Sequence, residues 1–241
     1  MSKVVAIHQP NFFPWLGYFD KILNCDEFVF FDDCQFPKKG GAWCNRVKLL
    51  IGGVQNWVTG AIDRKYSGFR NINEMVFLNS INWQKKILKS LNANYRRHPY
   101  FNETMEVILP LLLNSECNIA AYNISTITKI SEMLDLDASK LRKSSDFKSE
   151  GKSNALLCSL TKICGGTTYM CGGGADGYQD ESIFSDNGIS LKHQNYIPKP
   201  YEQFGCDKFE SGLSIIDILM NLGWNDTSRF IKSREPQVLR P

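Results

Sequence analysis

The sequence predicts an α/β protein with a Rossmann-like parallel or mixed sheet and a central helical insertion. Three observations predict this fold. Short apolar runs typical of buried strands alternate with amphipathic segments, polar or glycine-rich turns follow several of those runs, and residues 80–135 show helical periodicity without strands. We interpret residues 1–232 as a single domain that contains this insertion. Residues 233–241 have no core pattern and are expected to form a disordered tail.

The first elements form a strand, a turn, a helix and a second strand. Val4–Ile7 is an apolar run, and Leu16–Leu23 follows with its apolar positions on one helical face. Glu27–Phe31 is a second apolar run. A right-handed β-α-β connection would make the two strands parallel neighbours, so that their carboxyl ends lie at the same edge of the sheet.

The middle of the chain predicts a hairpin and then helices. Residues 43–50 and 56–59 have an extended pattern around Gly52-Gly53, which predicts a hairpin attached to the sheet. Apolar residues then recur at helical spacing until Pro99 marks a stop. The helices expected in the insertion are 83–98, 101–113 and 119–134.

The second half repeats the alternation of strands and helices. A short strand begins at Leu141, an amphipathic helix spans residues 155–164, and a buried strand spans residues 167–170. One more strand is expected at residues 191–196 and one more helix at residues 214–222. No repeat or low-complexity linker divides the chain.

Composition excludes several classes of partner. The chain has 241 residues, 43% of them hydrophobic and 22% charged, with a net charge of +3 that is spread rather than concentrated. A spread charge predicts that the chain does not bind DNA through a strongly positive surface. We also predict no membrane insertion, because no apolar stretch approaches the roughly 20 residues of a membrane helix. The amino terminus has no signal-peptide pattern, which favours a cytoplasmic location.

The eight cysteines predict neither a disulfide framework nor a metal site. They are dispersed along the chain, and no C-x-x-C pair or histidine at ligand spacing accompanies them. We expect reduced and mostly buried thiols, and we predict no metal ligands.

The catalytic candidates are His8 and Asp33, at the ends of the first two predicted strands. An imidazole can act as a general base near neutral pH, and the alternative is a structural histidine that orders the proline turn. Asp32 and Asp33 are adjacent, so alternation along a strand would point them to opposite faces. We favour Asp33 for the cleft, with a solvated turn carboxylate as the alternative.

Polar side chains near these strand ends are candidates for binding substrate. Gln9 can fix a ligand amide, hydroxyl or carboxylate, or it can instead cap the turn. Gln35, Lys39 and Arg46 can bind phosphate or carboxylate, arginine through its planar fork and lysine as a point charge. The paired lysines Lys38-Lys39 are otherwise an ordinary solvated turn. Four of the five tryptophans, at positions 15, 43, 57 and 83, are interpreted as core anchors.

A glycine-rich loop follows the strand at residues 167–170. Gly172 and Gly173 allow a close backbone approach, and exposed amides there can hold an anion. The loop matches neither a Walker motif nor a dinucleotide fingerprint. Cys171 is a conceivable nucleophile, but without a histidine nearby in sequence we favour apolar packing. His98 and His193 carry no partner signal and are interpreted as structural.

These residues together resemble the WbqC-like family of bacterial proteins. The resemblance covers nearly the whole chain except the tail, and its specific block is His8-Gln9-Pro10 with Pro14-Trp15-Leu16-Gly17-Tyr18-Phe19. The other matching residues are Lys21, 26–36, Trp43, Asn45-Arg46, 83–95, 99–101, Tyr169, Tyr178, 201–203, Phe209 and 213–217. Cys171 stands where a serine is expected. The resemblance adds Asn45 and Tyr178 to the candidate substrate-binding residues.

The resemblance implies a transferase of surface-polysaccharide biosynthesis. Members tend to be encoded with O-antigen, lipopolysaccharide or capsule enzymes, and some are labelled glycine transferases, which implies amide formation on a nucleotide-linked sugar. In that reaction His8 would be the general base, Asp33 would orient the amine or His8, and Lys39 and Arg46 would bind an anionic end of the substrate. The donor is an amino acid or an activated amino acid, and ATP and Mg²⁺ are the cofactors to consider.

Two alternatives stay open. The absence of a recognisable nucleophile triad, metal set or phosphate loop is compatible with a non-catalytic sugar-nucleotide-binding protein that assists a polysaccharide enzyme. The opening strand, turn and helix also look like those of nucleotidyltransferases. Trp15 and Tyr18 occupy the histidine positions of the H-x-G-H motif of those enzymes, so a shared fold would not carry their chemistry.

Overall fold

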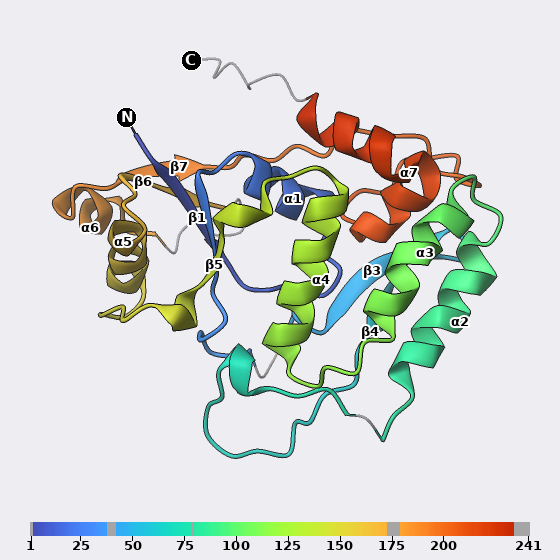
Figure 1. Cartoon of the computed structure of the whole chain (residues 1–241), viewed down its shortest axis with the longest axis horizontal. Coiled ribbons are helices and arrows are strands. Elements are labelled where there is room, and N and C mark those ends of the chain that lie inside the picture. The colour runs from blue at the N-terminus through green and yellow to red at the C-terminus, as the bar shows by residue number, and fades with distance from the viewer. Residues whose placement is uncertain (1, 38–41, 79, 173–178, 234–241) are drawn as a thin grey trace.

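The computed structural model describes residues 2–37, 42–78, 80–172 and 179–233 (Figure 1). Its main sheet has five strands in the order β5-β2-β1-β6-β7, and every neighbouring pair is parallel. The strands are β1 (Val4–His8), β2 (Glu27–Phe30), β5 (Leu141–Lys143), β6 (Thr168–Cys171) and β7 (Ser190–His193). The α/β fold predicted from the alternating strands and helices is therefore confirmed, and the main sheet is parallel rather than mixed.

The helices lie close to where the apolar periodicity places them. In the predicted insertion they are α2 (Trp83–Tyr95), α3 (Phe101–Leu112) and α4 (Ile119–Met133). The others are α1 (Leu16–Leu23), α5 (Asn154–Ile163), α6 (Glu181–Asp186) and α7 (Ile215–Lys232), and short 3₁₀ turns occupy Ile72–Glu74, Ala138–Lys140 and Ser144–Asp146. The last helix extends well beyond the predicted end at residue 222. No helix in the described ranges combines the length and apolarity needed to cross a bilayer.

The two faces of the sheet pack against different helices. Alternate residues of a strand point to opposite faces, and parallel sheets are usually covered on both. Ala6 and Phe28 belong to the large core that also contains α1 and α7, whereas Val5 and Val29 pack with α5 and α6 in a second cluster. Figure 1 accordingly shows α5 and α6 at one end of the molecule and α2 and α3 at the other.

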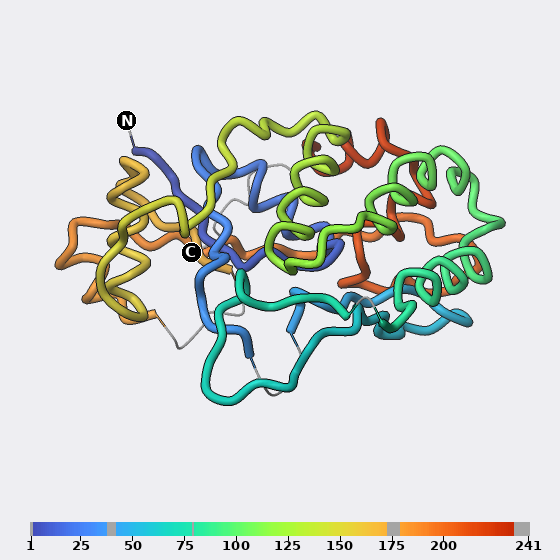
Figure 2. The backbone as a smooth tube through the Cα atoms, turned by 60° about the horizontal axis from the view of Figure 1, so that its bottom comes forward, coloured from blue at the N-terminus to red at the C-terminus, as the bar shows by residue number. Residues whose placement is uncertain are grey.

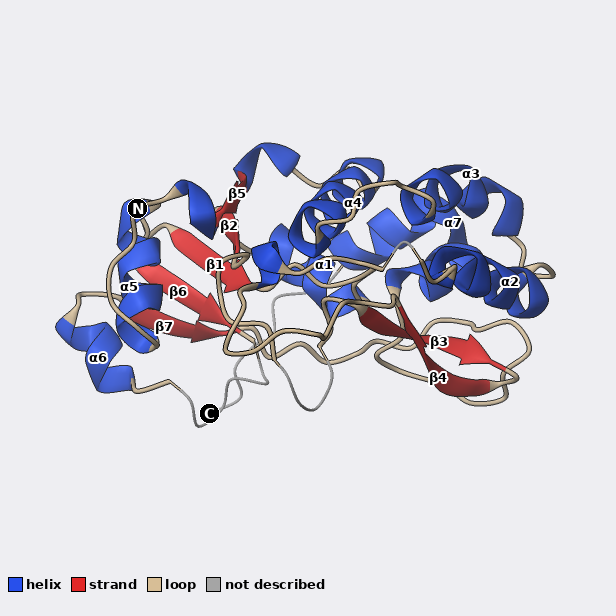
Figure 3. Cartoon of the chain, turned by 90° about the horizontal axis from the view of Figure 1, so that it is seen from below, coloured by secondary structure: helices blue, strands red, loops and turns tan. Residues whose placement is uncertain are grey.

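The hairpin forms a sheet of its own instead of joining the main sheet. Strands β3 (Arg46–Ile51) and β4 (Val54–Thr59) pair antiparallel around Gly52 and Gly53, whose φ values of +61° and +78° suit a tight turn. The hairpin packs against α2 and α7, so its location differs from the prediction. Figure 3 shows it beyond the carboxyl ends of the main strands, and Figure 2 shows the long connection from β4 to α2 looping away from the body.

Gly223 divides α7 into two helical segments. Its φ of 71° and ψ of −179° are accessible to glycine alone at low cost, and a Cβ built there would lie 2.6 Å from Cδ1 of Tyr100.

We expect Gly223→Ala to lower the free energy of unfolding by about 1–3 kcal/mol because of overpacking and backbone strain. Urea denaturation measures the change. Gly188→Ala is the matched control, because Gly188 has φ of +69° but no neighbour within 4 Å of the added Cβ. Equal losses in the two variants would contradict the steric part of this explanation.

Candidate functional site

The strand order creates a topological switch point between β1 and β6. From β1 the chain adds β2 and then β5 on one side of the sheet, and it later adds β6 and β7 on the other side. Open parallel sheets bind ligands outside the carboxyl ends of the strands at such a point. Figure 3 shows the arrowheads of β1, β6 and β7 directed toward the middle of the molecule. The residues that end β1 and β6 therefore define the candidate site.

His8 ends β1 and is partly buried with a defined tautomer. Its Nδ1 lies 3.0 Å from the carbonyl oxygen of Gln9, and its ring contacts Tyr18 edge-on at a centroid distance of 4.8 Å. A carbonyl can only accept, so Nδ1 carries the hydrogen and Nε2 keeps its lone pair. Burial, and then the charge of Lys21, lower the pKa of His8 to about 3, against a smaller opposing effect of the Gln9 carbonyl. The imidazole is therefore neutral at neutral pH.

The turn after β1 is held rigidly by protein contacts. The hydroxyl of Tyr18 donates to the carbonyl of Gln9 at 3.0 Å. The Gln9 side-chain amide donates to Sγ of Cys34 at 3.3 Å, and Sγ of Cys44 lies 3.9 Å from its oxygen. Phe13 is buried with φ of 39°, an uncommon backbone for a residue that is not glycine. Gln9 thus links the ends of β1 and β2 to the segment that leads into the hairpin.

Asp32 and Asp33 both face Ser144, which follows β5. The Ser144 hydroxyl lies 3.0 Å from Oδ1 of Asp32 and is also hydrogen-bonded to Oδ1 of Asp33. Ser145 donates to Asp32 through its backbone and its hydroxyl, at 3.0 and 2.7 Å. The two carboxylates were expected to point to opposite faces. They do not, because β2 ends at Phe30 and the strand alternation ends with it.

We expect Ser144→Ala to lower the free energy of unfolding by about 1–3 kcal/mol. The substitution removes a buried hydroxyl that is shared by two carboxylates and also accepts from the backbone of Asp32 at 3.2 Å. Chemical denaturation measures the effect. Ser139→Ala, at an exposed position, is expected to change stability by no more than about 0.5 kcal/mol. A Ser144→Ala protein as stable as this control would show that the carboxylates do not need the hydroxyl.

Lys21 was named in the sequence only as part of the resemblance, yet it lies in the site. It is on α1, is 2% exposed, and a Cβ built on Gly172 would be 3.2 Å from its Nζ. Burial lowers the pKa of Lys21 to about 8. A lysine in an amphipathic helix is usually read as solvent-facing, and no sequence signal distinguishes this one.

Cys171 and His193 meet at the carboxyl edge, one strand beyond β1. Strand pairing places the two residues opposite one another, and Sγ of Cys171 lies 3.3 Å from Nδ1 of His193. The thiol also donates to the carbonyl of Lys192 at 3.6 Å. His193 was interpreted as a residue without a partner and Cys171 as one without a histidine nearby. The two residues are distant in sequence and come into contact because β6 and β7 pair in this parallel register.

Of the other predicted binding residues, Asn45 and Arg46 lie at the start of the hairpin, and Gln35 forms a bridge with Asn71. Asn45 is buried and donates to the carbonyl of Gly60 at 2.9 Å, and Gln35 is exposed. The guanidinium carbon of Arg46 lies 4.2 Å from the ring centroid of Trp57. Trp57 contacts Trp43, and each is 39% exposed, so these two tryptophans are surface residues rather than core anchors. Of the predicted site residues, Lys39, Gly173 and Tyr178 lie outside the described residues.

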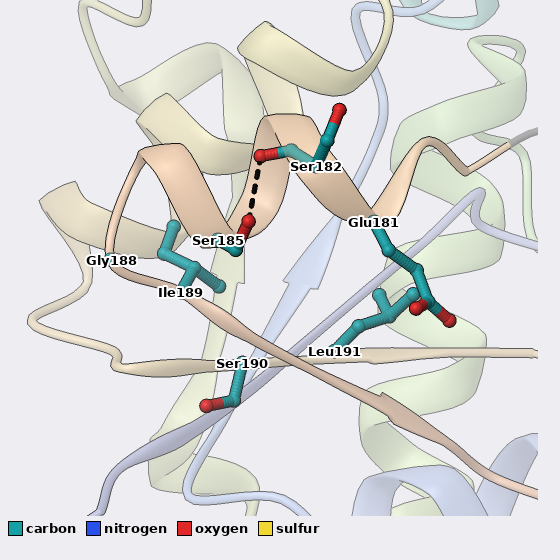
Figure 4. A pocket seen from close by; sticks show the side chains of 7 residues that line it. All are labelled: Glu181, Ser182, Ser185, Gly188, Ile189, Ser190 and Leu191. Carbon is teal, nitrogen blue, oxygen red and sulfur yellow. Dashed lines mark hydrogen bonds between the residues drawn. The ribbon is translucent and has the colours of Figure 1, made fainter.

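A cavity of about 540 Å³ lies elsewhere on the molecule. Figure 4 shows Glu181 and Ser182 of α6 and Ser190 of β7 among the seven residues that line it. Ser190 is the first residue of β7, so this cavity lies at the amino end of the strand. Its lining offers one carboxylate and no cation, and we place the candidate site at the carboxyl edge instead.

Comparisons with known proteins match nearly the whole chain, as the resemblance noted in the sequence does. The family model described as the WbqC-like protein family matches residues 9–229. A protein of Mycobacterium tuberculosis (strain ATCC 25618 / H37Rv), named Uncharacterized protein Rv1507c, is 30% identical over 223 residues, which are 92% of this chain and 94% of that protein. No solved structure matches the chain.

Proposed function

The chain belongs to the WbqC-like protein family, and from that premise we propose that it is a cytoplasmic transferase that forms an amide between glycine and a nucleotide-linked sugar. The observation that carries the proposal is the position of His8, a neutral imidazole at the carboxyl end of β1 beside the switch point. Amide formation needs a base for the attacking amine, and His8 offers the lone pair of Nε2. The glycyl and sugar parts follow from the resemblance to the family.

His8 would accept the proton of the amine as the new C–N bond forms and the bond between the acyl carbon and the oxygen of its leaving group breaks, the leaving group being the phosphate of an ATP-activated carboxyl or the tRNA of glycyl-tRNA. Its low pKa means that the lone pair is available throughout the neutral range, although its affinity for a proton is weak when the site is empty. The charge of Lys21 is one cause of that low pKa. An anionic substrate group beside Lys21 would offset this charge and raise the pKa of His8 when substrate is present.

Asp33 and Arg46 take supporting roles in this proposal. Asp33 belongs to the carboxylate pair fixed by Ser144, and from there it would orient the amine or the imidazole. Arg46, stacked on Trp57, would bind an anionic end of the substrate through its planar fork. Asn45 directly precedes the hairpin and Gln35 follows β2, and from there they would contact the sugar or the nucleotide.

A sugar-nucleotide-binding protein without catalysis is the second candidate function. The observation that favours it is also the electrostatics of His8, because an imidazole with a pKa of about 3 is a weak base. Such a protein would deliver its ligand to a neighbouring polysaccharide enzyme. It would bind the nucleotide-linked sugar and form no product.

Mass spectrometry of reaction mixtures tests the proposal. The full chain is incubated with isotopically labelled glycine, ATP and Mg²⁺ and a panel of nucleotide-linked amino sugars and uronic acids, with glycyl-tRNA as a parallel donor. The expected result is a labelled sugar nucleotide in one arm, which also identifies the donor. Binding of a nucleotide-linked sugar without product from any donor would overturn the transferase and support the second candidate.

A further inference from the structure

Lys21 is a buried cation without a counter-charge among the described residues. Lys21 is on α1, a helix that packs against α7, and is 2% exposed. No hydrogen bond or ion pair joins its ammonium to any residue in the described ranges, although six other ion pairs are formed there. A buried charge is normally paired, because transfer from water costs several kcal/mol.

The titratable groups closest to Lys21 do not supply a negative charge. Cys171, on β6, and Cys25, after α1, are the groups whose thiolates would act on it. Burial raises the pKa of Cys25 to about 12, so this thiol is neutral. The thiol of Cys171 donates to the carbonyl of Lys192 at 3.6 Å, and its Sγ lies 3.3 Å from Nδ1 of His193. His8, on β1, is neutral as well.

The ammonium lies where a ligand of an open parallel sheet would bind. It is close to Gly172, directly after β6, and its charge acts on His8 at the end of β1. These two strands flank the switch point. A Cβ at position 172 would lie 3.2 Å from Nζ, so the ammonium lies directly against the backbone of Gly172, where a side chain would crowd it.

We infer that Lys21 binds an oxyanion, the phosphate or carboxylate group of a small ligand, at the switch point between β1 and β6. The anion supplies the counter-charge that the described residues lack and accepts a charge-assisted hydrogen bond from Nζ. Only the source of this anion, meaning the ligand that carries it, rests on the proposed function. That ligand is either a nucleotide-linked sugar, through its diphosphate, or glycine, through its carboxylate. The ammonium therefore fixes one substrate beside the lone pair of His8.

Calorimetric titration of the full chain separates these sources. The probes are uridine diphosphate, inorganic pyrophosphate and glycine, each at pH 7 and constant ionic strength, without a second substrate. Lys21→Met is compared with Lys89→Met, which removes the same charge from an exposed position on α2. We expect at least one probe to bind, with affinity lowered about 10–100-fold in Lys21→Met and unchanged in Lys89→Met. The phosphate probes and glycine distinguish the two sources.

A second measurement follows the titration of Lys21 in the wild-type protein, with Lys21→Met used to assign its resonance. Lysines are reductively methylated with ¹³C, and the resonance of Lys21, assigned by its absence from Lys21→Met, is followed from pH 6 to pH 11. We expect a midpoint near pH 8 without ligand and a higher midpoint with a saturating anion, because the anion stabilises the charged form. Equal affinities of the two variants, an unchanged midpoint, or no binding of any probe would overturn the inference. Binding is measured without turnover, so failure of the transferase proposal leaves this result intact.

Discussion

His8→Ala is expected to lower kcat/KM of the proposed glycyl transfer by about 10²–10⁴-fold, the usual contribution of a general base. The substitution removes the Nε2 lone pair, while Gln9 keeps its bonds to Tyr18 and Cys34. Initial rates with the product identified by mass spectrometry measure the change. His193→Ala is the comparison variant, because it removes an imidazole from the same edge of the sheet without touching His8. Activity retained in His8→Ala would contradict the assignment of the base.

The pH dependence of the reaction gives an independent check on His8. Because the pKa of His8 is lowered from 6.5 to about 3, kcat/KM should not fall along a titration with a midpoint near pH 6.5.

The same lowered pKa affects stability. Between about pH 3 and pH 6.5 the histidine binds more protons in the unfolded chain than in the folded protein. This histidine therefore makes folding less favourable as pH falls from about 6.5 toward 3. In Lys21→Met the pKa of His8 should rise, and ¹⁵N or ¹H NMR of the imidazole measures it.

Lys21→Met is expected to weaken anion binding and at the same time to raise the free energy of unfolding at pH 7 by about 3 kcal/mol. The size follows from the lowering of the pKa of Lys21 from 10.5 to about 8, at about 1.4 kcal/mol for each pH unit. Methionine keeps most of the volume and carries no charge that must be desolvated. Chemical denaturation without ligand measures the gain.

The sign of this effect can be tested with pH. Between pH 8 and pH 10.5 the unfolded lysine holds a proton that the folded protein has lost, so wild-type stability rises with pH there. The advantage of Lys21→Met should be complete below pH 8 and should disappear by about pH 10.5. Lys89→Met should follow the wild type throughout, within about 0.5 kcal/mol. A Lys21→Met protein less stable than the wild type would show that the ammonium has a stabilising partner.

The sequence predicts the elements of this fold well, because most of them are local patterns. The apolar runs at Val4–Ile7 and at residues 167–170 became β1 and β6, and the periodic segments became α2, α3 and α4. The hairpin was found but misplaced. Its own pattern specifies two paired strands and a turn, but not the surface against which they pack.

The candidate site could be predicted only in part, since most of its contacts depend on the order of strands in the sheet. His8 was identifiable because it directly follows an apolar strand. The contact between Cys171 and His193 arises from the register of β6 with β7, and Asp32 turns toward Ser144 because the two lie at neighbouring strand ends. Lys21 is buried on α1, a helix that packs against α7, and the pattern of one helix does not reveal this packing.

The strand order also dictates when the site can exist during synthesis. Ala6 in the central strand pairs on one side with Phe28, which follows soon after it, and on the other side with Met170, far along the chain. At about 5–20 residues per second, the ribosome delivers β6 roughly 10–30 s after β1. Until then one long edge of β1 has no partner, and the apolar face it shares with β2 is incompletely covered. Nascent chains that stall before residue 168 should therefore be chaperone clients and should lack the switch point altogether.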